Sequence, residues 1–133
     1  MVRQIDQLAE GLMFPEGPAV GPDGDLYVTE LAGQRISRIS EDGTVSTYAD
    51  TGGGPNGAAF DANGDLVVCN NGGRWPSDVP STAQASDPEN GPGVMQRITS
   101  SGEIIDDLSE IDQIALNSPN DVCFDEHGGY YFT

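Results

Sequence analysis

Apolar and polar residues alternate over short stretches of this chain, and the same alternation returns three times. Residues 15–29, 55–69 and 119–133 align with one another without gaps. Each copy starts with Pro and a polar carboxylate or amide residue, continues with a short apolar run, turns at a glycine and ends with a second apolar run. Short apolar runs separated by turn residues are typical of β-strands. Each copy therefore predicts a β-hairpin.

The turn of each predicted hairpin holds a glycine at one aligned position. These glycines are Gly24, Gly64 and Gly128. Hairpin turns need residues with positive φ, which glycine adopts without steric cost. His127 directly precedes the third glycine, where small polar residues suit the turn. We therefore interpret His127 as a turn residue rather than as a base or a metal ligand.

A second repeated motif predicts two further strands in each unit. Residues 38–43 match residues 97–102, and strand-like residues flank both. Each complete unit then has four strands, and the first two units start 40 residues apart, at Glu16 and Asn56. This period is typical of a blade of a β-propeller. The sequence thus predicts an all-β fold built from propeller blades.

The repeats predict one partial β-propeller over residues 1–133, of about two and a half blades. The predicted boundaries are 1–14 for an N-terminal segment, 15–54 for blade 1, 55–118 for blade 2 with a polar loop inserted at 71–93, and 119–133 for the start of blade 3. A propeller ring closes with roughly four to eight blades. We therefore expect the sequence to be a fragment, with residues 2–9 as a closing strand of a last blade.

Composition and charge support this fold class and exclude some partners. The chain holds 18 Gly and 9 Pro, which fits many short elements joined by turns. Five Lys and Arg against 22 Asp and Glu give a formal net charge of −17. Such a field repels phosphate backbones and anionic lipids, so we expect neither a nucleic acid nor a membrane as partner.

The two cysteines, Cys69 and Cys123, provide neither a disulfide framework nor zinc-finger spacing. Both lie in apolar runs, where cysteine behaves as a small hydrophobic residue. Cys123 aligns with Ala19 and Ala59, so we expect all three to line a crowded central axis. No apolar stretch approaches the roughly 20 residues of a membrane span, and no signal peptide is recognisable. These features predict a cytoplasmic location.

The polar residue that starts the first strand of each copy is the main candidate for chemistry. In a four-stranded meander, Glu16, Asn56 and Asn120 would point from neighbouring blades toward one mouth of the central channel. A carboxylate with amide oxygens suits a hard cation such as calcium. Alternatively, these side chains cap exposed main-chain groups at the strand starts. The repeat alone leaves both interpretations open.

The inserted loop falls between the second and third strands of its blade, over the same channel mouth. It contains Arg74 and Trp75. One interpretation is a lid in which Trp75 covers an apolar face of a substrate and Arg74 binds an anionic group. The other is an ordinary surface loop, since long insertions are often tolerated there. The sequence favours neither.

Five motifs stand out along the chain: FPEGP at 14–18, GPNGAAF at 54–60, CNNGG at 69–73, SPNDV at 118–122 and GGYYFT at 128–133. Together they resemble the regucalcin/gluconolactonase/luciferin-regenerating-enzyme-like family. The resemblance implies a six-bladed propeller with calcium, or another divalent cation such as zinc, magnesium or manganese, in its channel. It implies Glu16 and Asn120 as metal ligands, with two further ligands in later blades.

The resemblance also implies a substrate pocket. Asn56 matches its pocket residue in the second blade, and Ser118 stands where some members have an arginine. With the motif residue Asp121 and the loop residues, the expected substrate-contacting set is Asn56, Ser118, Asp121, Arg74 and Trp75.

The implied activity is metal-dependent hydrolysis of a small-molecule lactone, in particular a sugar lactone. The cation polarises the carbonyl and a carboxylate activates water. The family's base would lie beyond Thr133, so we expect no hydrolysis by this chain alone. The alternative is a non-catalytic propeller that binds calcium or a protein partner.

Overall fold

The structure is a computed structural model that describes residues 4–74 and 91–133, and every element in it is a β-strand. The first four strands are β1 Pro15–Val20, β2 Leu26–Glu30, β3 Arg35–Ile39 and β4 Val45–Asp50. The next four are β5 Pro55–Phe60, β6 Leu66–Asn70, β7 Val94–Ile98 and β8 Ile104–Leu108. The last four strands form two short hairpins and are β9 Glu110–Ile111, β10 Ile114–Ala115, β11 Val122–Phe124 and β12 Tyr130–Phe132. The described residues contain no helix that could cross a membrane.

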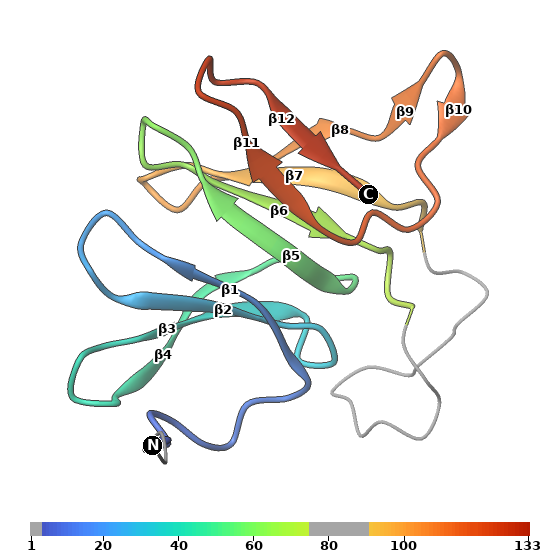
Figure 1. Ribbon diagram of the computed structural model, residues 1–133. Coiled ribbons are helices and arrows are strands. Elements are labelled where there is room, and N and C mark those ends of the chain that lie inside the picture. Colours follow the sequence, from blue (N-terminus) through green and yellow to red (C-terminus); the bar gives the residue numbers. More distant parts are fainter. Residues whose placement is uncertain (1–3, 75–90) are drawn as a thin grey trace.

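The repeats form two four-stranded antiparallel sheets, each a meander, and a final hairpin. The strand orders are β1-β2-β3-β4 and β5-β6-β7-β8, and β11 pairs with β12. The first strands of successive copies are neighbours, because β5 contacts both β1 and β11 (Figure 1). The copies therefore lie side by side in chain order, with β1, β5 and β11 at one common edge.

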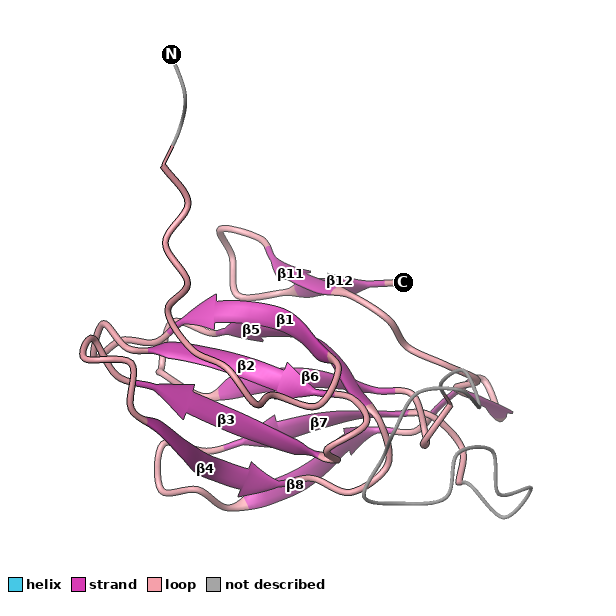
Figure 2. Cartoon of the chain, turned by 90° about the horizontal axis from the view of Figure 1, so that it is seen from below, coloured by secondary structure: helices cyan, strands magenta, loops and turns pink. Residues whose placement is uncertain are grey.

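The sheets pack face to face, and the second sheet is covered on both sides (Figure 2). Strand β6 is buried along its whole length. Val68 faces the first sheet in one hydrophobic cluster, whereas Val67 faces the β11–β12 hairpin in another. Successive side chains of a strand point to opposite faces. The continuous apolar run LVVCN is thus explained by burial on both faces.

Aromatic rings join the first two sheets. Tyr27 lies edge-on to Tyr48 and to Phe60, with ring centroids 4.8 Å and 4.9 Å apart. Such geometry adds roughly 0.5–1.5 kcal/mol per pair to the burial of the rings. Tyr27 comes from β2, Tyr48 from β4 and Phe60 from β5, so this cluster ties the two sheets together.

The predicted turn geometry is confirmed. Gly24, Gly64 and Gly128 have φ angles of 89°, 85° and 85°. In each turn the glycine N–H donates to the carbonyl three residues earlier, as in Gly24 to Gly21 at 3.0 Å. The aligned glycine is therefore explained by the backbone conformation of the hairpin.

The hairpin β9–β10 is a feature that the repeat does not predict. Its two turn residues, Asp112 and Gln113, have φ angles of 51° and 65° without being glycine. Ile111 and Ile114, which pair across the hairpin, are 49% and 73% exposed. The hairpin lies between the last strand of the second sheet and the segment that leads to β11.

The small residues of the first strands contact neighbouring copies or solvent, and their expected place on a central axis stays a prediction. Ala19 packs against the cluster between the two sheets, and Ala59 against the cluster between the second sheet and the hairpin. Both alanines thus face a neighbouring copy. Cys123 is exposed, because the described residues place no sheet over that face of β11. Cys69 is buried, as expected for a small hydrophobic residue.

A buried carboxylate holds the N-terminal segment against the first sheet. Glu30, at the end of β2, is fully buried. It accepts hydrogen bonds from the Met13 N–H at 2.7 Å, from Arg35 Nε at 2.8 Å and from Ser37 Oγ at 2.5 Å. We call this group the charged latch. It fixes the chain just before β1 begins.

The second copy has a neutral counterpart, which we call the amide latch. The Asn70 side chain is buried at the end of β6. Its Oδ1 accepts from the N–H groups of Gly54 and Gly72 at 2.8 Å and 3.0 Å. Its Nδ2 donates to the Gly52 carbonyl at 2.9 Å and to Gln96 Oε1 at 3.0 Å. This latch fixes the chain just before β5 begins.

Candidate functional site

Irregular pairing marks the start of the first strand in both sheets. The register of β1 with β2 shifts between Glu16 and Ala19, and that of β5 with β6 shifts between Pro55 and Ala58. Such bulges re-aim side chains and are frequent next to functional sites. The bulged segments contain Gly17 in the first copy and Asn56 in the second.

The strand-start residues of all three copies line one hollow of about 410 Å³ at the common edge of the sheets. Its walls are Glu16, Gly17, Pro18, Asn56, Gly57, Ala58, Asn120, Asp121 and Val122. The structure thus brings together Glu16, Asn56 and Asn120. The Glu16 and Asn120 side chains are exposed, and Asn56 is half-buried.

Hydrogen bonds connect the walls of the hollow across copies. Asn56 Nδ2 donates to Asn120 Oδ1 at 2.8 Å. The Gly57 N–H donates to the Asn120 carbonyl at 2.7 Å, and Thr29 Oγ1 donates to the Asn56 carbonyl at 2.6 Å. Asn56 and Asn120 therefore sit at fixed relative positions. Thr29, which links the first copy to Asn56, is a residue that the sequence interpretation missed.

Two glycines permit this close approach. A Cβ on Gly57 would lie 2.6 Å from the Asp121 Cα and 2.7 Å from the Asn120 carbonyl oxygen. A Cβ on Gly17 would lie 2.9 Å from the Ala58 nitrogen and would collide with the Asn56 carbonyl oxygen. These two positions align in the repeat, and that alignment is a signal by which the close contact could have been found.

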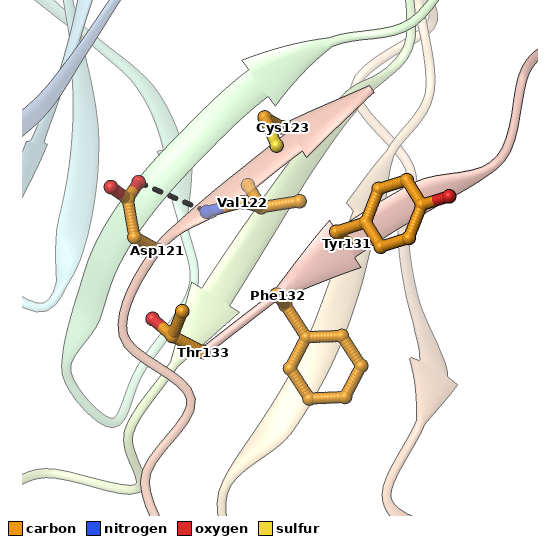
Figure 3. Close-up of a pocket in the computed structure, with 6 residues that line it drawn as sticks. All are labelled: Asp121, Val122, Cys123, Tyr131, Phe132 and Thr133. Carbon is orange, nitrogen blue, oxygen red and sulfur yellow. Dashed lines mark hydrogen bonds between the residues drawn. The ribbon is translucent and has the colours of Figure 1, made fainter. Parts of the chain in front are cut away.

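The lining of the hollow is acidic. It includes the carboxylates of Glu16 and Asp121 and no cationic side chain. Asp121 Oδ1 accepts a hydrogen bond from the Val122 N–H at 2.9 Å (Figure 3). Among the described residues the Glu16 carboxylate has no hydrogen-bond or ion-pair partner. Asp121 also lines a smaller hollow of about 130 Å³ on the β11–β12 hairpin, with Cys123 and Tyr131.

The nearby thiol is unsuited to nucleophilic chemistry. Burial, followed by the negative charge of Asp121, raises the pKa of Cys69 to about 12. The thiolate is the reactive form of cysteine, so this group stays protonated near neutral pH. The side chain instead packs in the cluster with Val67 and Met95.

The other predicted substrate-contacting residues lie outside the hollow or outside the described residues. Ser118 is exposed and does not line the hollow. Arg74 is also exposed, and its guanidinium donates to the main-chain carbonyls of Asn71 and Asn117. Trp75 falls in the part of the chain that the structure does not describe. The substrate roles of all three stay predictions.

The oxygen atoms that line the hollow are of the kinds that ligate a hard cation. Glu16 and Asp121 offer carboxylate oxygens, and Asn120 Oδ1 keeps a second lone pair beside its bond from Asn56. Oxygen donors of this kind suit calcium or magnesium. Within residues 4–74 and 91–133, no group of three or more His, Cys, Asp or Glu side chains is arranged for a metal. A cation here would therefore depend on the amide oxygens as well.

Four-stranded antiparallel meanders that share one edge with a polar hollow define a propeller-type fold. The sequence profile of the SMP-30/Gluconolactonase/LRE-like region matches residues 14–133. The chain therefore belongs to this family. No curated protein matches the chain significantly.

Solved structures of gluconolactonases are similar to this chain. A gluconolactonase from Xanthomonas campestris has 28% sequence identity and a TM-score of 0.75 over 95% of this chain. A structural-genomics target assigned as a gluconolactonase has 25% identity and a TM-score of 0.73 over 96% of this chain. This chain covers only 36% and 38% of those two proteins. Virginiamycin B lyase from Staphylococcus aureus shares the fold, with 21% sequence identity and a TM-score of 0.64 over 91% of this chain. This chain covers 34% of that protein.

Proposed function

We propose that this chain supplies part of the active site of a divalent-metal-dependent lactonase with a six-bladed propeller fold. The observation that carries the proposal is the shared hollow, where Glu16, Asn56 and Asn120 meet from three successive copies. Family membership and the similarity to gluconolactonases support a sugar lactone as the substrate class. We further propose a cytoplasmic location.

Glu16 and Asn120 would hold the cation, with calcium as the first choice. A bound divalent cation supplies Lewis acidity toward an ester carbonyl. The chain's own residues prepare the site for it. The Asn56 amide holds Asn120 Oδ1 at 2.8 Å, and the acidic lining favours a cation over an anion in the hollow.

Hydrolysis of a lactone adds water to the carbonyl carbon and breaks the ring C–O bond, and the ring oxygen takes a proton. The Asn56 amide and the Asp121 carboxylate line the hollow where the ring would bind. We assign the general base to no described residue. For the described residues the proposal is therefore limited to binding the cation and orienting the ring.

Calcium titration by isothermal calorimetry tests the metal part of this proposal. Glu16→Gln and Asn120→Ala should each weaken calcium binding by about tenfold or more, because each removes an oxygen donor or its charge. Asp25→Asn is the matched control, because Asp25 pairs with Arg38 and does not line the hollow. Equal calcium affinity in the wild type and both site variants would leave the capping interpretation.

Turnover is measured with gluconolactone as the substrate, with and without a chelator. Metal-dependent ring opening is the expected result. Calcium binding without hydrolysis of any lactone in a panel would instead support the non-catalytic calcium-binding alternative, and turnover unaffected by the chelator would contradict the metal mechanism.

A further inference from the structure

The base of the inserted loop is built tightly against the rest of the molecule. We call its two described legs, residues 71–74 and 91–93, the insertion stem. A Cβ on Gly72 would collide with the Gly91 carbonyl oxygen and would lie 3.2 Å from the Pro92 carbonyl oxygen. The two legs therefore touch, and Gly72 has the φ of 77° that only glycine adopts readily.

One leg of the stem binds the segment that leads to Asn56. The Asn71 side chain is buried and accepts hydrogen bonds from the N–H groups of Gly73 and Arg74 at 3.0 Å and 2.8 Å. Its Nδ2 donates to the Arg74 carbonyl at 2.7 Å. The Asn71 N–H donates to the Gly54 carbonyl at 2.9 Å. Gly54 lies two residues before Asn56.

Both legs also bind the segment that leads to Asn120. Arg74 Nη1 donates to the Asn71 carbonyl at 3.0 Å and to the Asn117 carbonyl. The Gly93 N–H donates to the Leu116 carbonyl at 2.9 Å. Asn117 lies three residues before Asn120, and Pro119 between them is buried and restricts the backbone.

We propose that Arg74 is a positioning residue, which fixes Asn120 through the Asn117 carbonyl so that Asn120 stays in hydrogen-bond contact with Asn56. The contact between Asn56 and Asn120 is independent of the proposed function, and only its importance for metal binding and catalysis rests on that function. The guanidinium suits the task because its Nη1 nitrogen carries two N–H donors, and each points to one of the two carbonyls. The same stem fixes the segments before both asparagines, so it sets the spacing of the two amides.

This role differs from direct contact with a substrate anion, because it operates in the ligand-free protein. An anion contact depends on positive charge, which Lys also provides. Bridging the two carbonyls depends on the long side chain and planar guanidinium that place Nη1 between them, whereas the shorter Lys side chain holds its ammonium at a different point. Arg74→Lys therefore separates the two roles.

The test is NMR spectroscopy of the ligand-free chain with ¹⁵N labelling. The Asn56 side-chain NH₂ signals, assigned by their loss in Asn56→Ala, report the bond to Asn120 Oδ1. In Arg74→Ala these signals should move toward free-amide shifts, and their hydrogen exchange should accelerate by about tenfold or more. Arg74→Lys should fall between Arg74→Ala and the wild type. Arg38→Ala, which removes an arginine paired with Asp23 and Asp25, should leave the signals unchanged.

A second measurement connects the position of Asn120 to binding. Calcium affinity should fall about tenfold in Arg74→Ala and remain unchanged in Arg38→Ala, because supporting residues of a metal site commonly contribute that much. Backbone signals of β1–β4 check that each variant is folded. Unchanged Asn56 signals in a folded Arg74→Ala variant would overturn the positioning role. If the Asn56 signals change in Arg74→Ala but the wild-type chain binds no calcium, the positioning role of Arg74 holds and the proposed metal site is rejected.

Discussion

The end of the second strand holds a buried polar side chain in both complete copies, but the two copies satisfy it differently. In the charged latch, Glu30 pairs across the sheet with Arg35. In the amide latch, Asn70 occupies the same position and lies opposite Val94. The two latches fix the same part of the blade, since Glu30 binds the Met13 N–H and Asn70 binds the Gly54 N–H.

This difference shows what a buried charge requires. Burial alone acts to raise the pKa of Glu30, but hydrogen bonds from Arg35, Ser37 and the Met13 N–H outweigh it and hold the pKa below its ordinary value. Asn70 carries no charge, so main-chain groups and Gln96 suffice for it. A charge and its cation must therefore change together when one latch is converted into the other.

Removal of the Glu30 carboxylate should have the largest effect. Glu30→Ala leaves Arg35, Ser37 and the Met13 N–H without their acceptor, and we expect the free energy of unfolding to fall by about 3 kcal/mol. Urea denaturation followed by circular dichroism measures it. Asp25→Ala is the control, because the Asp25–Arg38 pair is more exposed and should contribute much less to the free energy of unfolding. Equal losses in both variants would contradict the importance of the charged latch.

Introduction of a charge into the amide latch should lower the free energy of unfolding somewhat less than removal of the Glu30 carboxylate does. Asn70→Asp places a carboxylate against Gln96 Oε1 and the Gly52 carbonyl, with no cation opposite, and we expect a loss of about 2 kcal/mol at neutral pH. Burial without a cation raises the pKa of an introduced Asp, so the loss should shrink as the pH falls and the group is protonated. Asn63→Asp, in an exposed turn, should change stability by less than about 0.5 kcal/mol. A pH-independent loss in Asn70→Asp would show that charge is not its cause.

Titration of the charged latch should have the smallest effect of the three. Because the pKa of Glu30 is lowered on folding, its stabilisation is present above its ordinary value of 4.5 and is lost as the pH falls through the folded value. Asp23, Asp42 and Asp61 also have lowered pKa values, so they contribute to the pH dependence of stability as well. Comparison of the wild type with Glu30→Gln isolates the contribution of Glu30. The difference in their free energies of unfolding should narrow below pH 4.5. A constant difference down to pH 2 would contradict the prediction.

Features that recur in the sequence could be predicted, because the same physical requirement acts in every copy. The turn glycines are one example, since each has the positive φ that a hairpin demands. The strand-start residues are another, since Glu16, Asn56 and Asn120 were expected at one channel mouth and line one hollow. Their roles as ligands or pocket residues remain predictions.

Features that differ between the copies, or that occur in only one of them, left no such signal. Glu30 sits in a run, LYVTEL, that does not distinguish a buried carboxylate from an exposed one. The contact of Arg74 with Asn117 joins segments that lie 43 residues apart in the sequence. The hairpin β9–β10 turns at Asp112 and Gln113 without a glycine. Cys123 was expected to be crowded like Ala19 and Ala59, but it is exposed, whereas both alanines contact an adjacent copy.

The close approach at Gly17 and Gly57 has a consequence for the architecture as a whole. At these positions the inner margins of adjacent copies meet mainly through backbone atoms, joined at Gly57 by the Asp121 carboxylate. A wider residue would separate the inner margins while the outer strands kept their distance, and so would reduce the wedge angle of each blade. Smaller wedge angles require more blades to complete a circle. A single hydrogen in place of a methyl group at Gly17 and Gly57 thus keeps the first two joints between copies narrow, whereas the third copy has Asp121 at the aligned position.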